Sequence, residues 1–516
     1  MTPGRAGDDV VTDAPPLIEP LDEYDRRLLE NVHPPRWVNP RPKPRYHLVV
    51  IGAGTGGLVS AAAAAGLGAS VALIERQLMG GDCLNVGCVP SKAVIRAARA
   101  WHEAGRARDD FGGPATVGGG DFGAAMARMR RLRAGLSPID GAPRFRDLGV
   151  DVFLGNGRFV APDQVEVDGA SLTFRRAIIA TGARPIMPDV PGLVDAGCLT
   201  NETVFGLTDL PARLLVIGGG PVGCELAQAF ARLGSAVTLL DHGPRLLPRE
   251  DPDAAAIIER AMTRDGVALL RNARVVRVER EGPVKVAVVA RDGREERIAA
   301  DVVLAAAGRA PNVEGLGLEA AGVRYAATAV MVDDRLRTSN RRVFAVGDVA
   351  SPRKFTHNSD FQARIAIQNA LFFGRARVSR LVLPWCTYTA PEVAHVGMYE
   401  QEAREAGHRV ETLTVQLEDV DRATLDGETE GFFRVHLEGG TDRILGATLV
   451  AGHAGDMISE IVLAIVNRVG LGGIGRTMHP YPTQAEVFRK AADTWRRGKL
   501  TPRVRRLFDL YFRLFR

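Results

Sequence analysis

A strand, a glycine-rich turn and a helix occur in series near the start of this chain, and this pattern constrains the fold more than any other. The apolar, β-branched segment 47–51 predicts a buried strand, and the Ala-rich segment up to Leu67 predicts a helix. A second predicted strand, 70–74, ends at Glu75. The turn carries Gly52, Gly54 and Gly57. This is the fingerprint of a dinucleotide-binding unit, because the glycines permit a tight turn, the approach of a pyrophosphate and close helix packing.

The same pattern returns further along the chain. A predicted strand at 214–217 leads into a helix that runs to Leu233, and a strand at 236–240 ends at Asp241. The glycines of this turn are Gly218, Gly220 and Gly223. In each copy the acid follows the third glycine by 18 residues (57 to 75 and 223 to 241). The repeat predicts an α/β protein with two Rossmann-like dinucleotide-binding domains.

The cysteine segment, residues 80–92, has the sequence GGDCLNVGCVPSK and contains two of the five cysteines, Cys83 and Cys88. In an ideal helix, residues five apart lie about 8–9 Å apart at Cα, beyond the roughly 7 Å limit for a disulfide. The pair can bridge only if the first turn is open, which Gly87 and the following proline permit. A helix beginning near Ser91 would place its positive end beside the sulfurs and lower a thiol pKa. A redox-active pair is favoured over two buried thiols or a zinc half-site.

Composition narrows the class of protein. The 516 residues are 46% hydrophobic and 25% charged, as in soluble globular proteins of about three domains. A net charge of +5 on 66 basic and 61 acidic residues does not indicate nucleic-acid binding. Five cysteines in this length favour one active disulfide in a reducing, cytoplasmic compartment over a secreted scaffold. We expect no signal peptide, no membrane span and no bound metal.

The remaining segments complete the outline. Residues 1–44 are rich in proline, with a short helix expected around 21–31, and should pack on the surface or stay mobile. Residues 94–133 are expected to be helical, with a glycine-rich loop at 112–123. Further strands are predicted at 150–154, 158–160, 164–167, 177–182, 300–307, 343–347, 432–436 and 445–450, with a helix at 456–468.

With these motifs, residues 46–493 resemble the class I pyridine nucleotide-disulfide oxidoreductases, the family of glutathione reductase, dihydrolipoyl dehydrogenase and mercuric reductase. The resemblance implies a homodimer whose subunit has a discontinuous FAD domain, an inserted NAD(P) domain and a C-terminal α+β dimerisation domain. The implied boundaries are 1–44 (extension), 45–190 (FAD domain, first part), 191–307 (NAD(P) domain), 308–380 (FAD domain, second part), 381–493 (dimerisation domain) and 494–516 (basic tail).

The resemblance also implies where the two cofactors bind. The residues matching the FAD site are Gly52, Gly54, Gly57, Glu75, Thr181, Gly182, Gly347 and Asp348. The residues matching the nicotinamide-cofactor site are Gly218, Gly220, Gly223 and Asp241, with Arg309 nearby. The carboxylate of Asp241 favours NADH, because it would repel the 2′-phosphate of NADPH. Arg245, four residues later, supports the opposite preference.

In this family a hydride passes from nicotinamide to flavin, and the electrons then reduce the active disulfide. The resemblance implies that Cys88 is the thiolate facing the flavin and that Cys83 attacks the substrate. Lys92 and Glu225 match an ion pair beside the flavin, where the positive charge would stabilise the reduced, anionic form.

One position departs from most of the family. Tyr481 precedes Pro482 where the partner subunit normally supplies a histidine paired with a glutamate, here Glu486. Mercuric reductases resemble this chain in having tyrosine there, and a phenol with a pKa near 10 is a poorer general base than imidazole. No cysteine follows Cys386, so the C-terminal cysteine pair of mercuric reductase is missing. We expect a mercuric-reductase-like enzyme acting on a small disulfide or a thiol-bound metal, with dihydrolipoyl dehydrogenase as the alternative.

The tail, residues 496–516, is basic and amphipathic. Its apolar residues Leu507, Phe508, Tyr511, Leu514 and Phe515 fall on one face of a predicted helix. Such a helix can lie on an anionic membrane, which here would be the inner face of the cell membrane. It can equally dock on the dimer and cover the N-terminal extension. A membrane-associated redox adaptor is therefore the third hypothesis.

Overall fold

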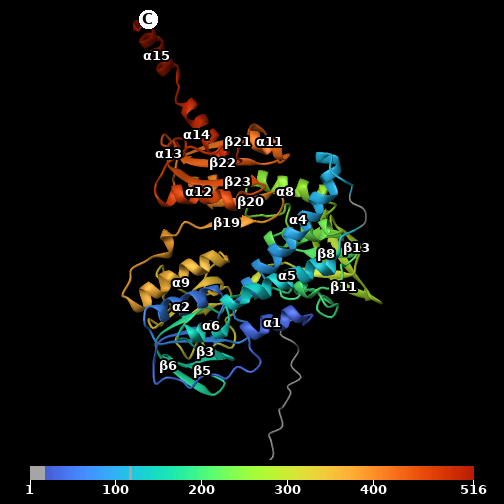
Figure 1. Cartoon of the computed structure of the whole chain (residues 1–516), viewed down its shortest axis with the longest axis vertical. Helices are drawn as coiled ribbons and strands as arrows, with labels where there is room; N and C mark the ends of the chain where they lie inside the picture. The colour runs from blue at the N-terminus through green and yellow to red at the C-terminus, as the bar shows by residue number, and fades with distance from the viewer. Residues whose placement is uncertain (1–17, 116–118, 516) are drawn as a thin grey trace, which may run out of the picture.

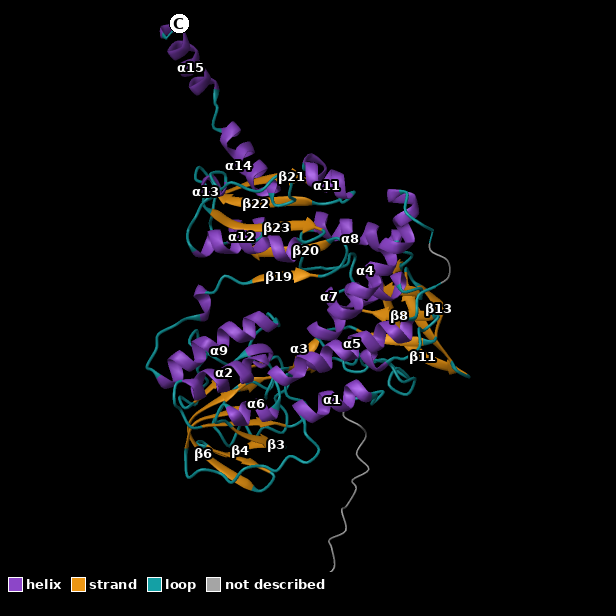
Figure 2. Ribbon diagram, viewed as in Figure 1, coloured by secondary structure: helices purple, strands orange, loops and turns teal. Residues whose placement is uncertain are grey.

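The computed structural model describes residues 18–115 and 119–515. It contains three sheet-based bodies with helices between them (Figures 1 and 2). The predicted fold class, α/β with two dinucleotide-binding domains and a third domain, is confirmed. Residues 1–17 of the proline-rich extension, positions 116–118 of the expected loop and Arg516 lie outside the described residues.

The first body is built on a parallel sheet in the order β3-β2-β1-β6-β18. Its strands are β1 (Tyr46–Ile51), β2 (Val71–Glu75), β3 (Asp151–Leu154), β6 (Ala170–Ile179) and β18 (Val343–Ala345). Leu48, Val49 and Val50 are fully buried, because layers cover both faces of the sheet. Helices α2 (Thr55–Gly66) and α9 (Thr356–Leu371) pack against each other on the sheet. Strand β18 follows the second body in the sequence but joins the sheet of the first body, so this domain is discontinuous in sequence.

Shorter elements extend this body. The first half of the long β6 pairs antiparallel with β5, so the expected strand at 177–182 is only the end of a longer strand. The additional elements are β4 (Gly157–Ala161), β5 (Gln164–Val167), β7 (Ala183–Pro185), β15 (Arg309–Pro311), β16 (Tyr325–Ala326), β17 (Ala329–Val330) and α6 (Ala142–Asp147).

The second body repeats the parallel arrangement, in the order β10-β9-β8-β14. Its elements are β8 (Arg213–Ile217), α7 (Pro221–Arg232), β9 (Ala236–Leu240), α8 (Pro252–Arg264), β10 (Ala268–Leu270) and β14 (Val302–Ala305). An antiparallel sheet adds β11 (Ala273–Glu281), β12 (Val284–Arg291) and β13 (Arg294–Ala300). The predicted strand 300–307 was wrong at its start, because Ala300 ends the antiparallel β13 and a separate parallel strand begins at Val302.

The third body is an antiparallel sheet in the order β19-β20-β23-β22-β21. Its strands are β19 (Pro384–Thr387), β20 (Glu392–Gly397), β21 (Val410–Gln416), β22 (Phe432–Glu438) and β23 (Ile444–Ala451). Its helices are α10 (Glu400–Glu405), α11 (Asp421–Asp426), α12 (Ala454–Val466), α13 (Leu471–Ile474) and α14 (Glu486–Gly498). Phe433 of the sheet packs edge-on against Phe488 of α14, and both rings are fully buried.

Four helices join the first two bodies: α1 (Glu23–Val32), α3 (Gly81–Asn85), α4 (Cys88–Phe111) and α5 (Phe122–Leu136). The described part of the N-terminal extension packs on the first body, because Leu28 and Val32 of α1 are fully buried. Trp37 then donates its indole N–H to the carbonyl of Val152 at 3.1 Å. The extension is therefore a structural layer of the first domain from residue 18 onward.

The C-terminal helix α15 (Pro502–Leu514) projects away from the rest of the molecule (Figure 1). None of its residues is buried in the single chain. Within one subunit, α15 therefore does not dock on the described part of the N-terminal extension. In the part of the chain that the structure describes, no helix is both long and apolar enough to span a membrane.

Candidate functional site

The cysteine segment folds as two helices with a break between them. Cys83 lies on the short helix α3, and Cys88 is the first residue of α4. The helix expected near Ser91 therefore begins three residues earlier, at Cys88. The break requires glycine at position 87, because a Cβ there would lie 2.7 Å from the carbonyl oxygen of Asp82. The break brings the two sulfurs into hydrogen-bonding contact, and the structure records both as free thiols.

The pKa values of the two thiols are shifted in opposite directions. The pKa of Cys88 falls to about 6, first because Cys83 donates a hydrogen bond to its sulfur. The hydroxyl of Thr356, 3.4 Å from the sulfur, and the positive charge of Lys92 add to this effect. The pKa of Cys83 is raised, because its proton is held by Cys88 and because it is buried. At neutral pH the pair therefore consists of a thiol and a thiolate, with the thiolate at the positive N-terminus of α4.

The predicted partners Lys92 and Glu225 lie together. Lys92 Nζ is 2.8 Å from Glu225 Oε2, and the Glu225 side chain is only 5% exposed. Burial lowers the pKa of Lys92, but the charge and hydrogen bond of Glu225, together with the nearby Cys88, raise that pKa overall. The backbone N–H of Tyr388 donates to the other carboxylate oxygen of Glu225, and Lys92 lies 4.5 Å above the Tyr388 ring. Residues of all three bodies thus meet beside the cysteine pair.

The first glycine turn has the geometry that its sequence predicts. Gly52 has φ 100°, and a Cβ there would lie 2.4 Å from the carbonyl oxygen of Ala180. A Cβ on Gly57 would lie 1.8 Å from the carbonyl oxygen of Gly52, so helix α2 packs directly on the turn. Gly54 caps α2 without a side chain, which leaves the first amides of the helix open to a phosphate.

The second glycine turn repeats this geometry. Gly218 has φ 112°, and a Cβ there would lie 2.6 Å from the carbonyl oxygen of Ala306. A Cβ on Gly223 would lie 1.9 Å from the carbonyl oxygen of Gly218. Gly220 caps α7 and has nothing within 4 Å of its Cβ position. Both turns therefore leave a free helix N-terminus.

The acids at the strand ends have equivalent hydrogen bonds. Glu75 accepts the N–H of Ala53 at 2.7 Å and of Gln77 at 2.8 Å. Asp241 accepts the N–H of Gly219 at 2.6 Å and the N–H of Gly243 at 2.7 Å. A carboxylate has about four acceptor positions, so each acid retains capacity for ribose hydroxyls. The residues present at both turns fit a dinucleotide.

The cysteine segment adjoins the first glycine turn. Gly80 donates its N–H to the carbonyl of Ala53 at 2.8 Å. A Cβ on Gly81 would lie 2.6 Å from the Cα of Gly54. The start of α3 therefore packs on the turn that would hold a pyrophosphate, which places the thiols in the first domain.

The later residues matched to the FAD site lie on loops around the same sheet. Thr181 donates its hydroxyl to the carbonyl of Asn312 at 2.8 Å, and the N–H of Gly347 donates to the side chain of Gln362 at 2.8 Å. Gly182, with φ 69°, follows Thr181 in a left-handed conformation. Burial raises the pKa of Asp348 even though a nearby arginine opposes it.

That arginine is Arg309, which was predicted to lie near the nicotinamide cofactor. It lies on β15 and donates to Asp82, beside Cys83, and its Nε is 3.8 Å from Asp348. The structure thus places its side chain against the cysteine segment and the first domain. Its role toward nicotinamide stays a prediction.

Tyr481 and Glu486 lie on the third body, away from the cysteines of the same chain. Tyr481 is 71% exposed and donates its hydroxyl to Asp421 at 2.9 Å. Glu486 is buried and forms an ion pair with Arg489. Among the hydrogen bonds between described residues, none joins Tyr481 to Glu486 or to the thiols. The exposure of Tyr481 leaves it free to reach a partner subunit.

Two contacts of the thiol site were not anticipated. Thr356 contacts Cys88 from 268 residues away, and Asp82 pairs with Arg309 from 227 residues away. Neither belongs to a local motif, although Asp82 adjoins the cysteine that the sequence did single out. Only the packing of α9 and β15 against the cysteine segment reveals them.

No cluster of three or more potential metal ligands occurs in residues 18–115 and 119–515.

Comparison with known proteins agrees with this geometry. The pyridine nucleotide-disulphide oxidoreductase family matches residues 46–370, and its dimerisation domain matches residues 383–492. A mercuric reductase of Bacillus cereus is 36% identical over 452 residues, covering 87% of this chain and 71% of that protein. A dihydrolipoyl dehydrogenase of Thermus scotoductus is 35% identical over 465 residues, covering 87% and 97%.

Solved structures agree as well. The HOCl-induced flavoprotein disulfide reductase RclA from Escherichia coli superposes with a TM-score of 0.77 at 28% identity, covering 87% of this chain and 99% of that one. The family uses FAD and NAD(P)H, and its dimerisation domain implies a homodimer. The chain therefore belongs to the pyridine nucleotide-disulphide oxidoreductase family and is an FAD-dependent disulfide oxidoreductase.

Proposed function

We propose that Cys83 and Cys88 form the redox-active disulfide and that the enzyme uses it to reduce a small disulfide or a thiol-bound metal. The observation that carries the proposal is the setting of Cys88, which begins α4 with the Thr356 hydroxyl 3.4 Å from its sulfur and the charge of Lys92 nearby. This setting lowers the pKa of Cys88. A thiolate at neutral pH can face the flavin, while a protonated neighbour is held ready for exchange.

The two dinucleotide turns would hold the cofactors. Gly52, Gly54, Gly57 and Glu75 would bind FAD, and Gly218, Gly220, Gly223 and Asp241 would bind the nicotinamide cofactor. When bound, these cofactors supply a hydride and pass two electrons to the disulfide. Lys92, fixed by Glu225 at 2.8 Å, places a positive charge beside the pair throughout. Asp348, Gly347, Thr181 and Gly182 would complete the FAD site.

Exchange with the substrate needs a proton carrier, and Cys88 can serve. As Cys83 Sγ attacks one substrate sulfur, its proton passes along the existing hydrogen bond to Cys88 and on to the leaving thiolate. A mixed disulfide on Cys83 results. Cys88 Sγ then attacks Cys83 Sγ, the second substrate thiolate leaves and takes a solvent proton, and the internal disulfide is restored.

NADH is the proposed donor. The Asp241 carboxylate lies at the end of β9, where it would oppose a 2′-phosphate. Arg245, the residue that favours NADPH, uses its guanidinium to donate to the carbonyls of Glu250 at 2.9 Å and Pro248 at 2.8 Å. An arginine committed to backbone carbonyls is poorly placed to bind a phosphate.

The enzyme is proposed to be mercuric-reductase-like. Dihydrolipoyl dehydrogenase activity is the second candidate, because the relative from Thermus scotoductus is a dihydrolipoyl dehydrogenase. The hydrogen bond to Asp421 raises the pKa of Tyr481, so this phenol stays protonated at neutral pH. From a partner subunit it can donate a hydrogen bond to a leaving thiolate or contact a soft metal. It is a poorer general base for lipoamide turnover than an imidazole.

The test is steady-state oxidation of NADH and NADPH by the FAD-loaded dimer against small disulfides, lipoamide, oxygen and mercuric ion. We expect turnover with NADH and a small disulfide or thiol-bound mercury. Cys88→Ser should abolish both turnover and the long-wavelength charge-transfer band, whereas Cys198→Ser should leave both intact. A band that persists in Cys88→Ser would refute the assigned role of Cys88.

Lipoamide tests the second candidate. Tyr481→His should raise lipoamide turnover if this position faces the substrate across the dimer. Efficient lipoamide turnover by the unmodified enzyme would instead show that Tyr481 is no obstacle and would favour dihydrolipoyl dehydrogenase.

The proposed location is the cytoplasm, with the tail in peripheral contact with the inner face of the membrane. The membrane contact is supported by the exposed large apolar side chains of α15, which are Leu507, Phe508, Leu510, Tyr511, Phe512 and Leu514. The redox-adaptor hypothesis would use the same helix as an anchor. If the protein turns over a small disulfide, it is an enzyme, and the tail would serve only to locate it at the membrane.

A further inference from the structure

A cavity of about 590 Å³ lies in the first domain on the far side from the glycine turn. Arg45 immediately precedes β1, and Arg342 immediately precedes β18. Arg175 and Arg176 come from β6, where Arg176 is paired with Leu48. The cavity is therefore formed near the amino ends of β1 and β18, whereas the FAD fingerprint follows the carboxyl end of β1.

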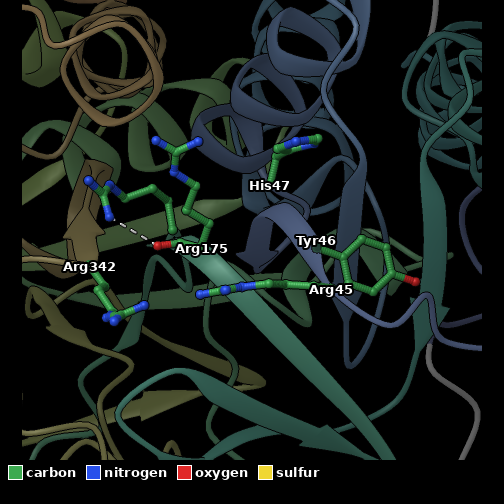
Figure 3. A pocket seen from close by; sticks show the side chains of 6 residues that line it. Arg45, Tyr46, His47, Arg175 and Arg342 are labelled. Carbon is green, nitrogen blue, oxygen red and sulfur yellow. Dashed lines mark hydrogen bonds between the residues drawn. The ribbon is translucent and has the colours of Figure 1, made fainter.

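Four of the six residues that line this basic pocket are arginines. Its six residues are Arg45, Tyr46, His47, Arg175, Arg176 and Arg342. Figure 3 shows the arginine side chains around the hollow, while the ring of Tyr46 points away from them. The hydroxyl of Tyr46 donates to Asp151 at 2.8 Å, outside the pocket. No carboxylate lines the cavity.

The positive charges of the basic pocket are poorly compensated. Within the described chain, neither Arg45 nor Arg175 forms an ion pair, and Arg342 has only Asp163, at 3.8 Å. Burial, and then the charges of Arg175 and Arg342, lower the pKa of Arg176. Like charges that line one pocket repel one another, and a bound anion would offset this repulsion.

The pocket is also partly preorganised. Arg176 donates through Nε to the carbonyl of Ala370 at 3.2 Å and through a terminal nitrogen to the carbonyl of Arg175 at 3.1 Å. The strand registers set the spacing of the backbones that carry the other arginines. Guanidinium groups bind phosphate oxygens in a bidentate manner, so several converging arginines suit a ligand with several phosphates.

We propose that the basic pocket binds an oligophosphate anion, such as a nucleoside triphosphate or tripolyphosphate. The cavity exceeds the size of one phosphate, and its four arginines match a chain of phosphates better than a single one. A membrane surface is not the ligand, because the pocket is concave and β6 lies at the end of the molecule opposite α15 (Figure 1). The bound anion would join the strands β1, β6 and β18, so it stabilises the discontinuous domain.

The test is calorimetric titration and thermal unfolding of the FAD-loaded dimer with tripolyphosphate, ATP and inorganic phosphate at low and physiological salt. We expect binding of the first two, a higher Tm, and much weaker binding of inorganic phosphate. Arg45→Gln with Arg175→Gln should weaken binding at least tenfold, since both side chains are exposed and without ion pairs. NADH-dependent turnover should be unchanged in this variant, which separates the result from the fate of the proposed function.

The matched control is Arg128→Gln with Arg131→Gln on α5, which removes two exposed arginines elsewhere in the described chain. It should change the affinity less than twofold. Equal weakening in both variants would show non-specific charge attraction and overturn the proposal. So would the absence of tripolyphosphate binding at millimolar concentration, or tighter binding of an RNA oligonucleotide than of tripolyphosphate.

Discussion

Thr356 lies far from the cysteine segment in the sequence but contacts one of its thiols. Its hydroxyl lies 3.4 Å from Cys88 Sγ and helps to lower that pKa to about 6. A hydrogen bond to a charged group contributes about 1.5–3 kcal/mol, and one pKa unit corresponds to about 1.4 kcal/mol. Because the pKa is lowered, the thiolate forms as pH rises through about 6 and is lost below it.

Thr356→Val should therefore raise the pKa of Cys88 by about one unit. The measurement is the pH dependence of the charge-transfer band in the reduced enzyme, together with the rate of alkylation by iodoacetamide. Thr356→Ser keeps the hydroxyl and should titrate like the unmodified protein. If Thr356→Val titrates at the same pH as the unmodified enzyme, the hydroxyl does not stabilise the thiolate.

At the scale of elements, helix α1 is linked to the cysteine segment through one arginine. Arg133 of α5 pairs with Asp25 of α1 at 2.7 Å, and the two side chains are 1% and 0% exposed. The same guanidinium donates to the carbonyl of Asn85, at the end of α3, at 2.7 Å. Burial lowers the pKa of Arg133, and the carboxylate of Asp25 opposes this effect. The extension outside the family match thus supports the helix that carries Cys83.

Asp25→Asn should destabilise the protein by about 3–5 kcal/mol, because it leaves a buried arginine without its counterion. Scanning calorimetry should show a lower Tm, and Cys83 should react faster with a thiol reagent as α3 loosens. Asp22→Asn is the control, since Asp22 is 27% exposed in its pair with Arg130 and should cost less. Equal losses in the two variants would argue against a special role for Asp25.

At the scale of the whole molecule, the dimer would present two copies of α15. This helix carries four arginines and one acid, Asp509, and all its described residues are accessible in the single chain. Basic residues near an anionic membrane contribute about 1 kcal/mol each, and exposed aromatic side chains add apolar contact.

Full-length protein should therefore pellet with phosphatidylserine-containing liposomes at least tenfold more than a chain truncated after Lys499. The difference should shrink at high salt, because charge attraction is screened. A variant with Phe508→Ser and Tyr511→Ser, which keeps every arginine, tests the apolar contribution. Equal pelleting of the full and truncated chains would remove the basis for membrane contact.

Much of the site was predictable because its signals are local. Both glycine turns, their acids and the cysteine pair lie within short segments whose backbone geometry depends on glycine, so their residue types reveal them. The start of α4 at Cys88 was not predicted, because it depends on the fit of Gly87 against the Asp82 carbonyl. The short parallel strand at 302–305 was predicted as part of a longer strand, 300–307, because alanines at positions 300, 306 and 307 flank it.

The sequence by itself determined the class of fold and the two dinucleotide units, and it predicted the two sulfurs of the redox pair, since each depends on steric or covalent properties of neighbouring residues. Only the tertiary structure shows which groups act on the sulfur of Cys88, because Thr356, Lys92 and Cys83 reach it through space. It also decided that α1 supports the cysteine segment and that four arginines converge on one cavity. Charges and hydrogen bonds depend on distance, and the fold sets the distance between residues hundreds of positions apart.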